Sequence, residues 1–128
     1  MWLIAAPSYI SLETVLEKEG IIFQKYQIVF MISYLSRKIK VGHREIFYRK
    51  IKDAILLNKI GVEESNNYFI ATKERAFLDA LFLYKNYHFD NLEGLDWNLI
   101  NDWQKIYNNK ALGKRVKEYY QIHKDENA

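Results

Sequence analysis

The segment after Thr72 most constrains the fold, because its apolar residues recur at helical spacing. This stripe consists of Ala76, Phe77, Ala80, Leu81 and Tyr84. Thr72 is a favourable N-cap, so the spacing predicts a helix from Lys73 to about Lys85. The run before it, Tyr68-Phe69-Ile70-Ala71, is aromatic and apolar, which is typical of a strand. A strand that leads into an apolar helix favours an α/β fold with this helix at its centre.

Two longer runs predict a hairpin. Gln27 to Leu35 is β-branched and aromatic without helical period, which indicates a largely buried strand. Glu45 to Ile51 alternates, with Ile46, Tyr48 and Lys50 on one face and Phe47, Arg49 and Ile51 on the other. Val41-Gly42 supplies a turn signal between the runs. We therefore expect these two strands to pair as a hairpin with a basic tip.

Shorter segments complete the N-terminal part. Pro7 to Ser11 opens a helix that Ser11 can cap and Gly20 ends, with Leu12, Val15 and Leu16 as its apolar stripe. Lys52 to Leu57 predicts a single helical turn. A second strand pair is expected from Ile60-Gly61-Val62 and the run before Thr72, with the polar turn Ser65-Asn66-Asn67 between them.

The C-terminal part predicts a helical hairpin. Asp96 is the expected N-cap of a helix with Trp97, Ile100, Trp103 and Tyr107 on one face. Asn108-Asn109 separates it from a last helix that carries Leu112, Val116, Tyr119 and Tyr120. Lys124 to Ala128 is polar and is expected to fray. Aromatic residues at this spacing pack in a core or form an interface.

These elements predict one α/β (α+β) domain over residues 1–128. Its α/β part, residues 1–90, has a small mixed or antiparallel sheet of about four strands, a basic hairpin and a central packing helix. The C-terminal helical hairpin spans residues 95–124. A length of 128 residues with 49% apolar content suits a single core.

Composition excludes several classes of protein. The chain has no cysteine, which rules out disulfides and thiolate metal sites and permits a reducing compartment. No apolar run is long enough to span a membrane, and Trp2 to Ala6 is too short for a signal peptide. We therefore expect a cytoplasmic protein without a membrane partner.

Positive charge is concentrated in one window. Residues 37–52 hold seven basic side chains against one acid, so the window carries +6 although the whole chain carries only +3. The seven are Arg37, Lys38, Lys40, Arg44, Arg49, Lys50 and Lys52. Interleaved with Phe47 and Tyr48, they are candidates to bind DNA, RNA or another partner. The alternative is a solvated face whose charges keep a strand edge from aggregating.

No pattern of catalytic residues is recognisable. The five glycines form neither a dinucleotide fingerprint nor a phosphate-binding loop, and the three histidines have no metal-ligand spacing. No carboxylate is followed two residues later by lysine, as in many metal-dependent nucleases. We therefore expect no enzyme activity, metal or cofactor. A degenerate nuclease-like enzyme stays an alternative if acids converge in space, and the candidates are Asp53, Glu63, Glu64, Glu74 and Asp79.

Two stretches carry a resemblance to a known family. They are Pro7-Ser8-Tyr9-Ile10-Ser11-Leu12-Glu13, continuing to Leu16 and Gly20, and the twelve residues from Tyr68 to Asp79. In this order, with a basic hairpin between them, they resemble the C-terminal domain of the AbiEi-like antitoxins. The resemblance spans roughly Ala5 to Tyr84 and is weaker beyond it. Lys73 and Arg75 stand where the family usually has Pro and Lys.

The resemblance implies a function and a set of motif residues. It implies that the chain is the antitoxin and transcriptional-regulator half of a type IV toxin–antitoxin system, a kind of system that acts in abortive infection and phage defence. The implied pairing with a nucleotidyltransferase-like toxin is functional, and the resemblance does not imply direct contact between the two proteins. The family's DNA-binding winged helix has no counterpart before Pro7, where Trp2 to Ala6 looks like the tail of a helix. The motif residues are Ser8, Tyr9, Ser11, Glu13, Thr72, Glu74, Arg75 and Asp79.

The second motif also has a purely structural interpretation. Thr72 caps a helix, Glu74 faces its positive end, and Arg75 and Asp79 form an i, i+4 pair of about 0.3 kcal/mol. Direct contact with a partner is the alternative for these residues.

Overall fold

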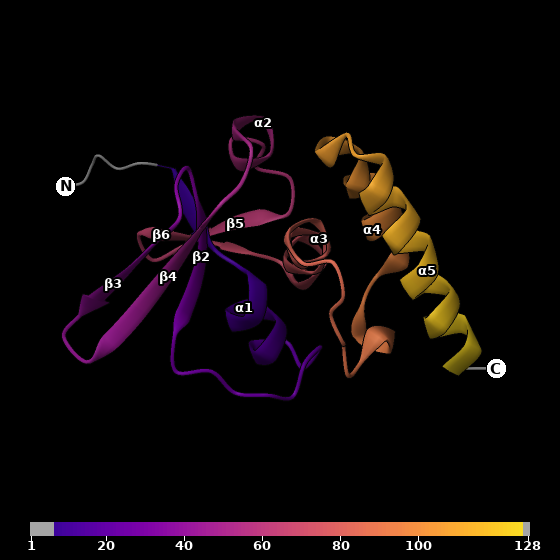
Figure 1. Cartoon of the computed structure of the whole chain (residues 1–128), viewed down its shortest axis with the longest axis horizontal. Helices are drawn as coiled ribbons and strands as arrows, with labels where there is room; N and C mark the ends of the chain where they lie inside the picture. Colours follow the sequence, from indigo (N-terminus) through magenta and orange to yellow (C-terminus); the bar gives the residue numbers. More distant parts are fainter. Residues whose placement is uncertain (1–6, 127–128) are drawn as a thin grey trace.

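The computed structural model describes residues 7–126, in which the strands lie at one end and the C-terminal helices at the other (Figure 1). The strands are β1 (Ser8–Ile10), β2 (Val29–Ser33), β3 (Arg37–Val41), β4 (Arg44–Lys50), β5 (Val62–Ser65) and β6 (Tyr68–Ala71). The helices are α1 (Leu12–Lys18), α2 (Asp53–Leu56), α3 (Lys73–Leu83), α4 (Trp97–Trp103) and α5 (Lys110–Glu126). Two short 3₁₀ helices complete them, η1 (Leu92–Gly94) and η2 (Gln104–Tyr107). The expected helix tail at Trp2 to Ala6 lies outside the described residues.

The sheet is mixed and has six strands in the order β3-β4-β2-β1-β6-β5. Neighbours β3/β4, β2/β1 and β6/β5 are antiparallel, whereas β4/β2 and β1/β6 are parallel. The mixed α/β class is confirmed, and the expectation of about four strands is wrong. The two strands that the sequence did not reveal are β1 and β3.

The structure contains a basic hairpin, but one of the two strands predicted to form it is incorrect. β4 forms the hairpin with β3, through a turn at Gly42 and His43, and β2 lies parallel to β4 on its other side. Gly42 has a φ of +63°, which a two-residue hairpin turn requires. The charged segment 37–41 is an edge strand, so it pairs with β4 on one side and faces solvent on the other. Charged side chains are common on such edges.

The first motif begins as a strand and not as a helix. Ser8–Ile10 forms β1, paired with both β2 and β6 near the middle of the sheet. α1 starts only at Leu12, and Ser11 occupies the N-cap position without a side-chain capping bond. The predicted stripe is otherwise correct, because Leu12, Val15 and Leu16 are all buried.

α3 is the central helix that the sequence predicts. The Thr72 hydroxyl accepts from the Arg75 amide at 3.4 Å, as expected of the cap. Ala76, Phe77, Ala80 and Leu81 of the predicted stripe are buried, and so are the residues between them, so protein surrounds most of α3. Tyr84, the last member of the stripe, is half-buried and follows the end of the helix at Leu83. The second strand pair and the single turn before it are present as β5, β6 and α2, but β5 covers Val62–Ser65 and not the predicted Ile60 to Val62.

The C-terminal helices pack against α3 and against each other (Figure 1). Asp96 caps α4 as predicted, accepting from the Asn98 and Leu99 amides at 3.0 and 3.3 Å. The expected helix through Tyr107 is divided into α4 and η2, and Asn108 ends it in the left-handed conformation. α5 continues through Lys124 to Glu126, where the polar composition predicted a frayed end. No helix within residues 7–126 is long and apolar enough to span a membrane.

Candidate functional site

The cations of the basic window are divided between two faces of the β3–β4 hairpin. Side chains alternate along a strand, and the register places Arg37 opposite Tyr48 and Lys38 opposite Phe47. One face therefore carries Arg37, Arg44 and Lys50 with Tyr48. The other carries Lys38, Lys40 and Arg49 with Phe47, and Lys52 lies beyond β4. The six cations on the strands thus form two groups of three, and each group lies on the same face as one aromatic ring.

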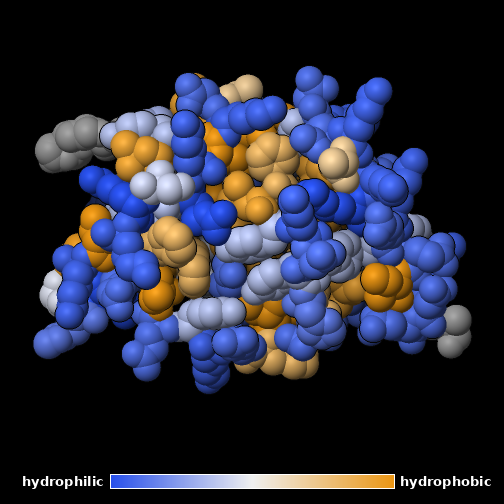
Figure 2. Space-filling view, viewed as in Figure 1, coloured by the Kyte–Doolittle hydropathy of each residue, from blue (hydrophilic) through white to orange (hydrophobic). Residues whose placement is uncertain are grey.

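Several of these cations lie over aromatic rings. Arg37 is 5.3 Å from the centroid of Tyr48, and Lys38 is 5.4 Å from that of Phe47. Arg49 lies between Phe47 and Tyr84, at 5.7 and 5.2 Å. Figure 2 shows hydrophilic side chains over this end of the molecule with hydrophobic ones between them. Such a surface offers charges for phosphates and rings for stacking.

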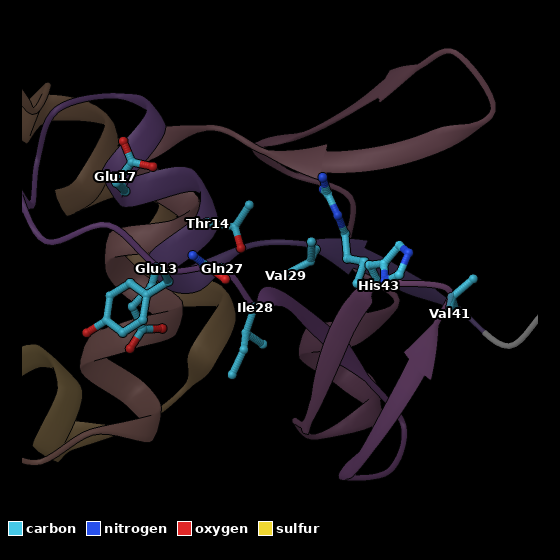
Figure 3. Close-up of a pocket in the computed structure, with 10 residues that line it drawn as sticks. Glu13, Thr14, Glu17, Gln27, Ile28, Val29, Val41 and His43 are labelled. Atoms are coloured by element: carbon cyan, nitrogen blue, oxygen red, sulfur yellow. The ribbon is translucent and has the colours of Figure 1, made fainter.

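A cavity of about 590 Å³ adjoins the hairpin tip (Figure 3). One wall is α1, with Glu13, Thr14 and Glu17, and the opposite wall is the tip with its exposed His43 and Arg44. The segment 26–29 lines the cavity between them. Acidic groups therefore face basic groups across this cavity.

Glu13, a motif residue, is an acceptor for two tyrosines. The hydroxyls of Tyr84 and Tyr87 donate to its two carboxylate oxygens at 3.0 and 3.4 Å. Burial, and then the Glu13 charge, raise the pKa of both phenols, so both stay protonated and able to donate at neutral pH. Glu13 thereby joins α1 to the segment after α3.

Asp79 is the centre of a buried polar network that the two motifs build together. The hydroxyls of Tyr9 and Ser11 donate to its Oδ2 at 2.9 and 2.7 Å. Tyr107 donates to its Oδ1 at 2.6 Å. Burial raises the pKa of the Asp79 carboxyl, while Arg75 and the three hydroxyls oppose this shift. The network joins β1, α3 and η2.

Arg75 extends the network to the loop after α2. Its Nη1 donates to the carbonyls of Asn58 and Ile60, and its Nη2 donates to the carbonyl of Ile55 and to the Tyr9 hydroxyl. Its Nε lies 3.5 Å from Asp79 Oδ1, which is ion-pair contact without a hydrogen bond. Both side chains are fully buried. The predicted i, i+4 pair is therefore present, but the value of about 0.3 kcal/mol applies to exposed pairs and does not describe this buried one.

The other motif residues also contact their own fold. Glu74 Oε2 accepts from the Asp96 amide at 2.9 Å and so fixes the start of α4. Ser8 pairs with Ser33 in the sheet. Ser11, expected as a cap, directs its hydroxyl to Asp79 because Oδ2 is within reach. Tyr107 was not recognised as a member of this network, since no local pattern links it to a residue 28 positions away.

The acids that an enzyme would need are dispersed. Asp53, Glu63 and Glu64 are exposed, whereas Glu74 and Asp79 are buried in the contacts described above. Within residues 7–126, no group of three or more histidines or acids could hold a metal ion.

Comparison with known proteins adds no relative. No protein-family model matches the chain, and no curated protein or solved structure matches it.

Proposed function

We propose that this chain is the antitoxin and regulator domain of a type IV toxin–antitoxin system and that it counteracts a nucleotidyltransferase-like toxin. It acts by binding a partner and not by catalysis, and the β3–β4 hairpin is the binding surface. The observation that supports this proposal best is the convergence of the two motif stretches.

Residues far apart in the chain form one unit. Tyr9 and Ser11 come from the first motif, Arg75 and Asp79 from the second, and all four meet in the network around Asp79. The two stretches that carry the resemblance thus contribute to one structural unit of this chain, which supports the proposal.

The network leaves the exposed cations available for binding. Of the six predicted cations on the strands, five are exposed and Arg49 is half-buried. The exposed ones are Arg37, Lys38, Lys40, Arg44 and Lys50. A charged surface of this kind suits electrostatic recognition of an anionic partner.

Co-expression tests the antitoxin proposal. The chain is produced together with a nucleotidyltransferase-like toxin of a type IV system, and colony formation is compared with toxin alone. We expect the chain to restore growth. Failure to restore growth by a chain that is folded and abundant in the same cells contradicts the proposal.

A second candidate function is nucleic-acid binding by the hairpin, and the cation–ring contacts favour it. Two alanine variants separate the faces: one replaces Arg37, Arg44 and Lys50, and the other replaces Lys38, Lys40 and Arg49. If three phosphate contacts are lost, the slope of log affinity against log salt falls by roughly 2.7 on duplex DNA. Unchanged affinity and slope in both variants exclude the hairpin as the nucleic-acid surface.

A further inference from the structure

The two edges of the sheet carry opposite charges. β3 and β5 are the edge strands, each hydrogen-bonded to a neighbouring strand on one side. β3 contains three exposed cations, Arg37, Lys38 and Lys40, and no acid. β5 contains the exposed acids Glu63 and Glu64 and no base. None of these five takes part in an ion pair within residues 7–126.

We infer that the β3 edge of one copy of this chain pairs with the β5 edge of a second copy, which extends the sheet. This inference goes beyond the proposed function and does not depend on it.

Strand directions permit this pairing. Followed across the sheet, the pairings make β3, β1 and β6 run one way and β4, β2 and β5 the other. When two copies lie side by side with their helices on the same side, β3 of one therefore runs antiparallel to β5 of the next. This is the geometry in which edge strands exchange straight hydrogen bonds.

One register also matches the side chains. Lys38 and Glu64 lie on the same face of the sheet, and Arg37 and Glu63 lie on the opposite face. With Lys38 opposite Glu64, Arg37 is diagonal to Glu63, and Lys40 is diagonal to Glu64. Directly opposed and diagonal pairs of opposite charge stabilise strand pairs.

Like edges repel each other. Two β3 edges would bring together six cations, and two β5 edges would bring together four acids. Charges on edge strands commonly prevent association. Here the charges oppose pairing of β3 with β3 and of β5 with β5, and they favour pairing of β3 with β5. Two copies joined in this way still have an unpaired β3 at one end and an unpaired β5 at the other. Growth is then open-ended.

Sedimentation velocity over a concentration series at low salt tests the inference. We expect wild-type protein to associate with rising concentration and to dissociate as salt is added, because exposed charges are screened. The double variants Lys38→Glu with Lys40→Glu and Glu63→Lys with Glu64→Lys should each stay monomeric. An equimolar mixture of the two should associate again, because one junction is the wild-type pairing and the other has the opposite charges at positions 38, 40 and 64 exchanged.

A matched control carries the same charge change elsewhere. Lys114→Glu with Lys117→Glu alters two exposed residues of α5 and should associate as the wild type does. Wild-type protein that stays monomeric at low salt overturns the inference. So do edge variants that associate like the control, or a mixture of edge variants that stays monomeric.

Discussion

Tyr107 donates a hydrogen bond of 2.6 Å to Asp79, which joins the turn after α4 to the middle of α3. Both side chains are almost fully excluded from solvent. Replacing Tyr107 with Phe leaves a buried carboxylate oxygen short of a donor. We expect a loss of about 1.5–3 kcal/mol in the free energy of unfolding, measured by urea denaturation. Tyr34→Phe, at an exposed position, is the control and should change it little.

Asp79→Ala tests the centre of the network. It leaves the fully buried Arg75 guanidinium without a counter-charge, and we expect a loss of about 3–5 kcal/mol. Tyr107→Phe should then cost less in this background than in the wild type, because its acceptor is gone. Equal costs of Tyr107→Phe in both backgrounds would show that the hydrogen bond contributes nothing.

Two glycines with positive φ provide a matched pair. Alanine at Gly61 (φ +74°) would place its Cβ 2.7 Å from a ring carbon of Trp103, whereas alanine at Gly42 (φ +63°) would meet nothing within 4 Å. Both variants carry backbone strain, and only Gly61→Ala adds a clash. We expect Gly61→Ala to lower the melting temperature further, by the equivalent of about 1–3 kcal/mol. Equal melting temperatures would contradict this packing.

The buried phenols should resist ionisation. Burial raises the pKa of Tyr9 and Tyr107 above the ordinary value of 10.0, and the Asp79 charge raises both further. The folded state therefore holds protons that the unfolded state releases above about pH 10, so stability falls as pH rises beyond that value. In an absorbance titration, these two should ionise only together with unfolding. Their ionisation near pH 10 in folded protein would be inconsistent with the network.

Local patterns predicted much of the fold, and non-local pairing explains the rest. The spacing after Thr72 identified α3, and Asp96 marked the start of α4 correctly. β1 has only three residues, too few to show alternation. That β2 lies parallel to β4 depends on contacts across the sheet, which no local turn signal specifies.

The burial of Arg75 and Asp79 was also missed, because charged residues ordinarily face solvent. A signal was present in the sequence. The helix that contains them has apolar residues on nearly every side, including Phe77, Leu78 and Leu81, and such a helix is buried all round. Its two charged residues four positions apart were therefore candidates for an internal pair.

The positions of the cations were predicted better than their grouping. The alternation of Tyr48 with Phe47 along β4 was correct, but the sequence did not reveal β3 as their hairpin partner. Without β3, the separation of Arg37 from Lys38 onto opposite faces could not be seen.

The central claim is that function depends on the exposed cations, whereas the motif network stabilises the fold. Growth rescue by two variants tests this claim most directly. One variant is Tyr107→Phe, and the other replaces the five exposed strand cations, Arg37, Lys38, Lys40, Arg44 and Lys50, with alanine. Against the co-expressed toxin, we predict that Tyr107→Phe rescues growth below its lowered melting temperature. We predict that the cation variant fails although it melts like the wild type. Full rescue by the cation variant, or failure of folded Tyr107→Phe, would contradict this account.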